Sequence, residues 1–438
     1  MTDRRSGGPG RPDAAGGTPH RVARVFLIVL VGAALQLLVQ TVFARALPKD
    51  EVGLISLVLG ALPLLSTITI LGQDSSIVRF LSRSASGSHD IRGYVGRVVG
   101  VSAPSGALVG FAAALYYDLP TLAAAAAILL VASQNTITLV TSVARGRHLY
   151  ERAMAGARLP FALAAVALVL IWAFDALTLT VGLWTLIGAF LLSGVLCSSW
   201  SLTGLAPGAV RVPRSVIQEG LLFFGLSLSF SVMTAADKLV IGRMMTLEDL
   251  AVYATVFAVM RAFDFTFYAI GYVLMPRVNA LGRVPLGRLN AWIAGIAVLM
   301  TAGYLLLGDD VVRLLYAGRY DAGSYLILPF ALSGVLKLFY SVPSSVIGGR
   351  LPRAALRTFL WFNIGGMVLN VALDIVLIGY MGLLGAAVAT AIAWGIRLAG
   401  GYVILARFRA DLGPRPTGSG TTQNTEGNTH GSQDEEGA

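Results

Sequence analysis

Long apolar stretches alternate with short polar loops along almost the whole chain. A helix needs about 20 consecutive, mostly apolar residues to span the hydrocarbon core of a bilayer. Backbone polar groups in lipid must be satisfied within their own segment, so each stretch is predicted to be a helix. The predicted spans are 22–44, 53–72, 95–117, 121–144, 159–174, 177–200, 219–243, 251–275, 289–308, 325–347, 358–380 and 383–405.

The composition agrees with an all-α membrane protein. Of the 438 residues, 56% are hydrophobic and 13% are charged, whereas soluble domains have about 45–50% and about 25%. A cleaved signal peptide does not explain the pattern, because the first apolar run is too long and lacks a small-residue cleavage site. The single cysteine, Cys197, excludes a disulfide framework and a cysteine-based metal cluster.

The charges predict the orientation. With the N-terminus in the cytoplasm, 24 of the 33 lysines and arginines flank the inner ends of the spans and five flank the outer ends. This excess places both termini in the cytoplasm by the positive-inside rule. The net charge of +10 is therefore explained by membrane topology, and no nucleic-acid partner is expected. Abundant alanine, glycine and arginine suggest a GC-rich bacterial genome, so the predicted location is the bacterial plasma (inner) membrane.

An internal repeat divides the chain. Arg45-Ala-Leu-Pro-Lys-Asp-Glu-Val-Gly-Leu-Ile follows the first span, and Arg243-Met-Met-Thr-Leu-Glu-Asp-Leu-Ala-Val-Tyr follows the seventh at an offset of 198 residues. Six helices return the chain to its starting side, so the halves are predicted to be parallel repeats about an axis along the membrane normal. The acidic pairs Asp50-Glu51 and Glu248-Asp249 are interpreted as helix-start signals. The predicted parts are a disordered N-terminus (1–21), two six-helix lobes (22–200 and 219–407), a cytoplasmic linker (201–218) and a disordered tail (408–438).

Several motifs, taken in order, resemble those of polysaccharide flippases. They are the segment from Phe43 to Ser56, Leu71-Gly-Gln-Asp, Val78-Arg-Phe-Leu, Ala236-Asp-Lys-Leu-Val-Ile-Gly, Leu315-Tyr-Ala-Gly-Arg-Tyr-Asp and the segment from Asn370 to Thr390. These flippases belong to the multidrug/oligosaccharidyl-lipid/polysaccharide (MOP) exporter superfamily, and the resemblance covers residues 22–407. It implies a V of two lobes that open alternately to each side. It also implies a polyprenyl-diphosphate-linked oligosaccharide as cargo, membrane lipids as surroundings, and glycosyltransferases and a polymerase as partners.

A diphosphate cargo gives a reason for positive charge inside the membrane. A charge at mid-membrane costs roughly 2.5–3.5 kcal/mol on insertion scales, so each one needs an explanation. Arg261 and Lys337 are nearest the middle of their spans and are predicted to bind the diphosphate, with Arg79 meeting it on entry. Alternatives remain: Asp264 could neutralise Arg261 at i, i+3, and Arg79 could be a topogenic charge.

Uncharged polar residues are candidates for the sugar. Sugar hydroxyls need donors and acceptors, and Gln40, Gln134 and Asn135 lie within predicted spans. The alternative is hydrogen bonding between helices, which is a common use of these residues in membranes.

A cation site is predicted in the second half. Asn370 and Asp374 share one helix face at i, i+4, Asp237 is an intramembrane carboxylate, and Thr390 adds a hydroxyl. Hard cations take oxygen ligands of this kind. In the lipid II flippases of the superfamily, a sodium site has the same residue types and spacing. That resemblance implies sodium here, with the backbone carbonyl of Ala386 as a further ligand. Proton coupling and a purely structural cluster are the alternatives.

No enzyme is predicted. The chain has no phosphate-binding G-x-x-x-x-G-K-[ST] motif, its four histidines are scattered in loops and tails, and no long outer loop could house a catalytic domain. The alternatives to a polysaccharide flippase are a lipid II flippase, a multidrug exporter, or a membrane-embedded polymerase or ligase. Lipid II flippases typically place an Arg-Asp pair in helix one and arginines in helix two. This chain has Gln40-Thr41 and Ser66-Thr67 there, which disfavours lipid II.

Overall fold

Helices make up the whole described structure. The computed structural model describes residues 19–83, 90–203, 205, 212–280 and 284–412, and within these ranges it has thirteen α-helices, two 3-10 turns and no strand. Twelve of the helices are long and apolar enough to cross a membrane. The predicted all-α membrane fold of twelve spans is therefore confirmed. Most of the two predicted disordered ends lies outside the described residues, although residues 19–21 belong to the first helix and Arg409–Leu412 forms a 3-10 turn.

Seven helices form the N-terminal lobe. They are α1 (Pro19–Ala46), α2 (Lys49–Ile70), α3 (Gln73–Arg83), α4 (Ile91–Tyr116), α5 (Thr121–Gly146), α6 (Tyr150–Ala173) and α7 (Leu179–Leu202).

Six helices and a 3-10 turn form the C-terminal lobe. They are α8 (Arg214–Met244), α9 (Leu247–Ala280), α10 (Leu286–Tyr316), the 3-10 turn Asp321–Leu326, α11 (Ile327–Arg350), α12 (Arg353–Met381) and α13 (Leu383–Arg407).

The two lobes are packed in the same way. In the N-terminal lobe α5 contacts α2, α4 and α7, and α1 contacts α6; in the C-terminal lobe α11 contacts α9, α10 and α13, and α8 contacts α12. The helix ends follow the repeat as well: α1 ends at Ala46 and α2 begins at Lys49, while α8 ends at Met244 and α9 begins at Leu247, 198 residues later. The internal repeat is thus a repeat of helix packing.

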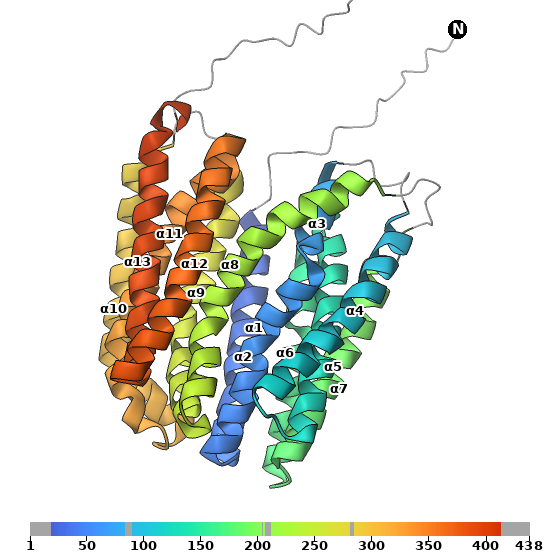
Figure 1. Ribbon diagram of the computed structural model, residues 1–438, viewed down its shortest axis with the longest axis vertical. Coiled ribbons are helices and arrows are strands. Elements are labelled where there is room, and N and C mark those ends of the chain that lie inside the picture. The colour runs from blue at the N-terminus through green and yellow to red at the C-terminus, as the bar shows by residue number, and fades with distance from the viewer. Residues whose placement is uncertain (1–18, 84–89, 204, 206–211, 281–283, 413–438) are drawn as a thin grey trace, which may run out of the picture.

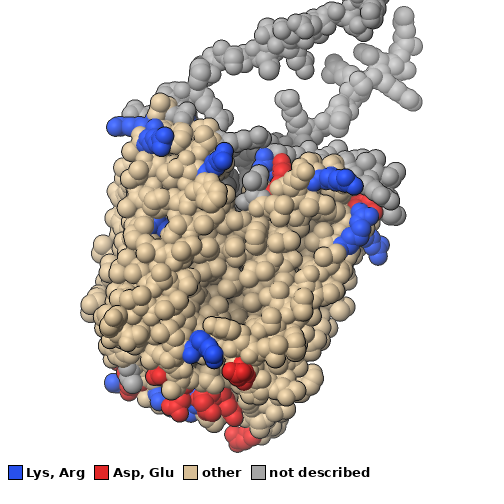
Figure 2. Space-filling view, in the orientation of Figure 1, with Lys and Arg blue, Asp and Glu red and all other residues tan. Residues whose placement is uncertain are grey.

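Charged side chains gather near the two ends of the molecule and leave a broad, almost uncharged band between them (Figure 2). The lobes stand side by side, and α1 begins at the same end at which α13 finishes (Figure 1). We call this the predicted cytoplasmic end, and the opposite one the predicted outer end. Between the lobes, α2 contacts α8 and α9, α3 contacts α8, and α1 contacts α9 and α10.

The short helix α3 differs from the predicted loop between the second and third spans. Leu71 and Gly72 take positive φ values of 53° and 71°, which ends α2 and restarts the chain as a separate helix. Its sequence alternates polar residues with Ile77, Phe80 and Leu81 on one face, so it is amphipathic rather than membrane-spanning. A search for long apolar stretches does not detect a helix of this kind.

The helix starts after the repeat motif were predicted correctly. Asp50 and Glu51 lie in the first turn of α2. In α9, the Thr246 hydroxyl accepts from the amide of Asp249 at 3.1 Å, and Asp249 Oδ2 accepts from the amide of Thr246 at 3.2 Å. This reciprocal pair satisfies two backbone donors that a helix start leaves free.

We expect Gly385→Ala to lower the thermal stability of the purified protein. A Cβ atom at Gly385 would lie 2.1 Å from the carbonyl oxygen of Leu377, so α13 and α12 would have to move apart. Overpacking of this kind typically costs about 1–3 kcal/mol. The matched control is Gly395→Ala on the same helix, where the nearest atom is 3.8 Å away. The measurement is the melting temperature in detergent without sodium, which should be the same as or higher than the wild-type value in the control variant. Equal melting temperatures for the two variants would refute the close α12–α13 contact.

Candidate functional site

A tight helical hairpin positions the predicted cation ligands. Gly382 joins α12 to α13 with φ of +60°, a left-handed conformation that glycine adopts without steric cost. Asp374 lies eight residues before Gly382 and Thr390 eight residues after it, so the two antiparallel helices hold them at the same depth. Small residues at the start of α13 let the helices pack closely. The hairpin therefore brings side chains from α12 and α13 together.

Asp237 of α8 meets this hairpin inside the C-terminal lobe. Thr390 Oγ1 donates to Asp237 Oδ2 at 2.8 Å, and the hydroxyl of Tyr253 in α9 donates to the same oxygen at 2.5 Å. Asp237 and Asp374 are close enough to interact electrostatically. Asn370, one turn before Asp374 on the same face of α12, and Asp374 itself are both fully buried. Four helices thus converge on one cluster of oxygen atoms.

Most of the polar side-chain atoms in this cluster have no hydrogen-bond partner among the residues that the structure describes. These buried, unpartnered atoms are Asp237 Oδ1, both amide atoms of Asn370 and both carboxylate oxygens of Asp374. A buried polar group without a hydrogen bond is costly, and a buried carboxylate more so. Oxygen donors of this kind fit a hard cation. In the described residues, no group of three or more His, Cys, Asp and Glu side chains is placed so that it could hold a metal ion. The donor set of two carboxylates, an amide and a hydroxyl therefore fits a monovalent ion better than a transition metal.

Neighbouring cations form no salt bridge with the pair in the described residues, although Lys238 interacts electrostatically with Asp237. Lys238 follows Asp237 in sequence, but its Nζ lies 4.2 Å from the centre of the Phe257 ring. Across the described ranges, neither Asp237 nor Asp374 forms a salt bridge. Ala386, whose carbonyl the resemblance implied as a ligand, is fully buried one turn before Thr390 on α13.

Lys337, which was predicted to bind the diphosphate, is paired with a carboxylate within the C-terminal lobe. Its Nζ forms a salt bridge with Asp264 of α9 and lies 4.9 Å from the centre of the Trp394 ring. Its side chain is 7% exposed, and an ammonium group so deeply buried needs a paired carboxylate. Asp264, which was considered as a partner for Arg261, is thereby engaged by Lys337.

Two arginines from opposite lobes lie near one another. Arg261 of α9 and Arg158 of α6 interact electrostatically, and neither makes a hydrogen bond or salt bridge with the described part of the chain. The Arg158 guanidinium lies 5.5 Å from the centre of the ring of Phe265 in α9, and its aliphatic stem packs on Gly32 of α1. Asp264 also acts electrostatically on Arg261, but in the described ranges no carboxylate forms a salt bridge with either arginine. Like charges repel, so an anion bound between the two arginines would relieve their repulsion.

Arg158 is the main residue that the sequence reasoning missed. The predicted span began at 159, which placed Arg158 among the topogenic loop charges, whereas α6 begins at Tyr150. At 1.5 Å per residue, Arg158 is about 12 Å inside the helix. Glu151 and Arg152 hid the helix start, because they lower the local hydropathy. Tyr253 was also missed, since its role depends on the spatial position of Asp237.

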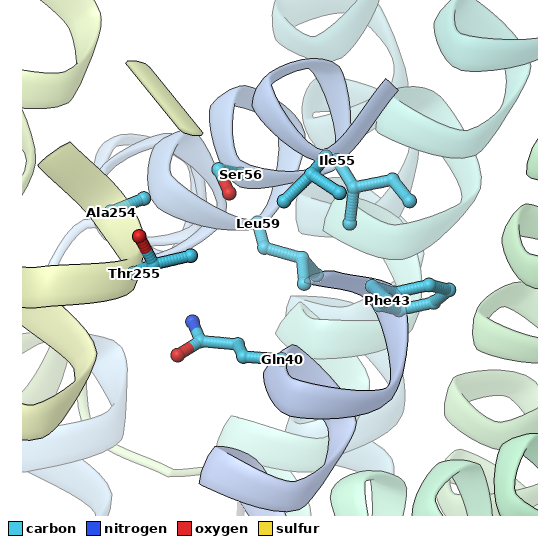
Figure 3. Close-up of a pocket in the computed structure, with 8 residues that line it drawn as sticks. Gln40, Phe43, Ile55, Ser56, Leu59, Ala254 and Thr255 are labelled. Atoms are coloured by element: carbon cyan, nitrogen blue, oxygen red, sulfur yellow. The ribbon is translucent and has the colours of Figure 1, made fainter. Parts of the chain in front are cut away.

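Gln40, predicted as a candidate for contact with the sugar, lines a pocket between the lobes. The other pocket walls come from Phe43 of α1, from α2, and from Ala254 and Thr255 of α9. Figure 3 shows the Gln40 amide directed into this space opposite Thr255. Its Oε1 is buried without a hydrogen-bond partner.

The neighbouring amides on α5 serve the helix packing. Asn135 is fully buried, and its Nδ2 donates to Thr69 Oγ1 and to the Ser102 carbonyl, both at 2.8 Å. Its position within the N-terminal lobe matches the alternative of interhelical hydrogen bonding. Gln134 donates to Thr138 on its own helix at 3.0 Å.

Arg79 belongs to α3 rather than to the end of the second span. Its Nε lies 3.6 Å from Glu219 of α8, and its guanidinium is 5.8 Å from the centre of the Phe223 ring. It therefore joins the two lobes at the predicted cytoplasmic end. About a third of its side chain is exposed there.

Comparisons with solved structures identify the fold. An inward-facing multidrug resistance MATE family transporter of the MOP superfamily matches with a TM-score of 0.64 and 15% identity, over 88% of this chain and 98% of its own. The lipid II flippase MurJ, in an inward closed conformation, matches with a TM-score of 0.59 and 12% identity, over 89% of this chain and 88% of its own. A MOP superfamily transporter from Pyrococcus furiosus matches with a TM-score of 0.52 and 13% identity, over 89% of this chain and 96% of its own. At these identities the likeness concerns the fold.

The sequence comparison adds the family. No curated protein matches the sequence. The family model described as polysaccharide biosynthesis protein matches residues 21–281, which is more than half of the chain. The chain therefore belongs to the polysaccharide biosynthesis protein family and has the fold of the MOP transporter superfamily, as its motifs predicted.

Proposed function

We propose that this protein flips a polyprenyl-diphosphate-linked oligosaccharide across the bacterial plasma membrane by alternating access, with both termini in the cytoplasm. The observation that carries the proposal is the unpaired pair Arg158 and Arg261, one from each lobe. A diphosphate between them would offset two partly buried cations at once, and guanidinium groups bind phosphate oxygens in a bidentate manner. Since each lobe supplies one arginine, the complete site exists only when the lobes enclose the headgroup.

The family match supports a glycan cargo rather than a drug. Diphosphate-linked lipids of several pathways share the anionic headgroup, so the arginine pair alone does not select among them. Gln40 supports the glycan, because its unpartnered amide oxygen offers a hydrogen-bond acceptor in the pocket between the lobes. The glycosyltransferases that build the unit and the polymerase that consumes it would be the partners of such a flippase.

We further propose that sodium binds the cluster of Asp237, Asn370, Asp374 and Thr390, with the Ala386 carbonyl as the fifth ligand. The unpartnered carboxylate and amide oxygens support this assignment. Sodium would offset the repulsion between the two carboxylates, while Tyr253 and Thr390 hold one oxygen of Asp237 in place. Protonation of the carboxylates is the competing possibility, and the two differ in their response to sodium at constant pH.

Arg158→Ala and Arg261→Ala should each reduce flipping by roughly 10- to 100-fold, which is the cost of losing one charge-assisted hydrogen-bond partner. The assay uses proteoliposomes with a fluorescent polyprenyl-diphosphate glycan, whose transfer is followed by a membrane-impermeant quencher. Arg152→Ala is the matched control, because Arg152 is an exposed arginine on the same helix. Normal flipping by both variants at normal protein levels would contradict the proposed headgroup site.

Asp374→Asn should abolish the stabilisation of the purified protein by sodium. At a sodium concentration 100 times Kd, binding to the folded state stabilises it by about 2.7 kcal/mol. The measurement is the melting temperature in detergent with sodium chloride against choline chloride at fixed pH. Asp310→Asn, at an exposed aspartate of α10, is the control and should keep the response. A sodium response that persists in Asp374→Asn would rule out the site; a wild-type protein that responds only to pH would indicate proton coupling.

A further inference from the structure

The two arginines of the internal repeat lie at the predicted outer end, and both reach across to the opposite lobe. Arg45 ends α1 and Arg243 lies in the last turn of α8. The C-terminal end of a helix leaves carbonyl oxygens without intrahelical partners, and these favour cations. The arginines of the repeat are therefore placed where the ends of helices from different lobes meet.

Arg45 of the N-terminal lobe binds backbone carbonyls of the C-terminal lobe. Arg45 Nε donates to the carbonyl of Leu315 at 2.7 Å, and its Nη2 donates to that of Leu314 at 2.5 Å. Both carbonyls belong to the last turn of α10 in the C-terminal lobe. An arginine of one lobe thus caps a helix of the other.

Arg319 of the C-terminal lobe makes the reciprocal contact with the N-terminal lobe. It follows α10, and its Nη1 donates to the carbonyls of Ala44 and Arg45 at 2.9 and 2.8 Å, while its Nη2 donates to that of Leu47 at 2.9 Å. These carbonyls lie at the end of α1 in the N-terminal lobe. Five hydrogen bonds therefore tie the end of α1 to the end of α10. Arg45, near the end of α1, binds carbonyls of α10, and Arg319, just after α10, binds carbonyls at the end of α1. We call this arrangement the arginine latch.

A weaker counterpart forms at the symmetry-related position. Arg243 Nη1 lies 3.7 Å from Asp118 Oδ2, and the Tyr117 hydroxyl donates to the carbonyl of Leu239 at 3.0 Å. Burial raises the pKa of Tyr117 to about 12, so the hydroxyl keeps its proton at physiological pH. The Arg243 and Asp118 side chains are 53% and 84% exposed, and exposed ion pairs contribute little. The arginine latch is thus the stronger of the two contacts.

The interface beneath the latch is closed. A Cβ atom at Gly53 of α2 would lie 1.8 Å from the carbonyl oxygen of Leu247 in α9, so the two lobes touch through their backbones. Tyr316 and Tyr320 from the C-terminal lobe are fully buried and pack within the hydrophobic core of the N-terminal lobe. The pocket lined by Gln40 and Ser56 lies further from this end along α1 and α2 (Figure 3).

We propose that the arginine latch, Arg45 and Arg319, is the gate that holds the outer end of the cavity closed and opens when the lobes face outward. This inference rests on the alternating access and the orientation proposed above. The latch joins side chains only to backbone carbonyls at helix ends, which water can hydrate once the lobes part. Such bonds have a low cost of breaking in an open state and favour the closed one, as a reversible gate requires.

The test measures access to the pocket below the gate. In a Cys197→Ser background, which removes the only cysteine, Ser56→Cys provides a reporter for a membrane-impermeant maleimide added to spheroplasts. Combining it with Arg45→Ala and Arg319→Ala should raise the labelling rate about tenfold or more, because several charge-assisted bonds that favour the closed state are lost. The matched control is Arg313→Ala, whose ion pair with Asp321 lies within the C-terminal lobe.

Two further measurements keep the test decisive. The double variant Arg45→Lys with Arg319→Lys retains the charges but not the guanidinium fork. Its labelling rate should therefore lie between those of the wild type and the alanine pair. This conservative variant shows whether the labelling rate rises in a protein that is still folded. An unchanged labelling rate in both pairs, with normal gel-filtration profiles, would overturn the latch. A rise seen only in inverted vesicles would support the latch and overturn the orientation. None of these readouts uses glycan or sodium, so failure here is distinguishable from failure of the proposed function.

Discussion

The constraint on which the rest of the structure depends is the cost of a polar group inside hydrocarbon. Most buried side chains obey it in a simple way. Arg397 is 2% exposed and donates to Asn363 and Ser229, and Lys337 is paired with Asp264. These groups are satisfied within one lobe and stabilise its packing. Against this background, two sets of charged groups stand out: the carboxylate cluster, whose oxygens are buried without a hydrogen-bond partner in the described residues, and the arginines Arg158 and Arg261, which form no salt bridge there.

The two lobes use one scaffold for different chemistry. In the N-terminal lobe the central helix α5 carries Asn135, which bonds neutral partners in α2 and α4. In the C-terminal lobe the hairpin of α12 and α13 brings carboxylates to Asp237 and leaves their oxygens unpartnered. Repetition explains the common packing, whereas the buried charges are confined to one copy.

The sequence predicted the elements better than the contacts between them. Twelve apolar stretches give twelve helices because each has to cross the same thickness of hydrocarbon. The cluster around Asp374 could be suggested because i, i+4 spacing fixes a shared helix face. Pairings between helices far apart in sequence were beyond such reasoning: Lys337 with Asp264, and Arg158 with the surroundings of Arg261. Periodicity predicts which face of its helix a residue occupies. The residue of another helix that it contacts depends on tertiary packing.

Helix α9 connects the three features that matter for transport. Its first residue, Leu247, touches α2 at the predicted outer end. Tyr253, less than two turns on, donates a hydrogen bond to Asp237 of the carboxylate cluster, and Arg261 lies near Arg158 of the other lobe. A helix is stiff along its axis, so these contacts cannot move independently. A small cavity lined by Asp237, Asp264 and Lys337 also adjoins α9 and links the cluster to the Lys337 ion pair. A change in charge at Asp237 therefore acts on the same helix that carries Arg261 and part of the contact between the lobes at the predicted outer end.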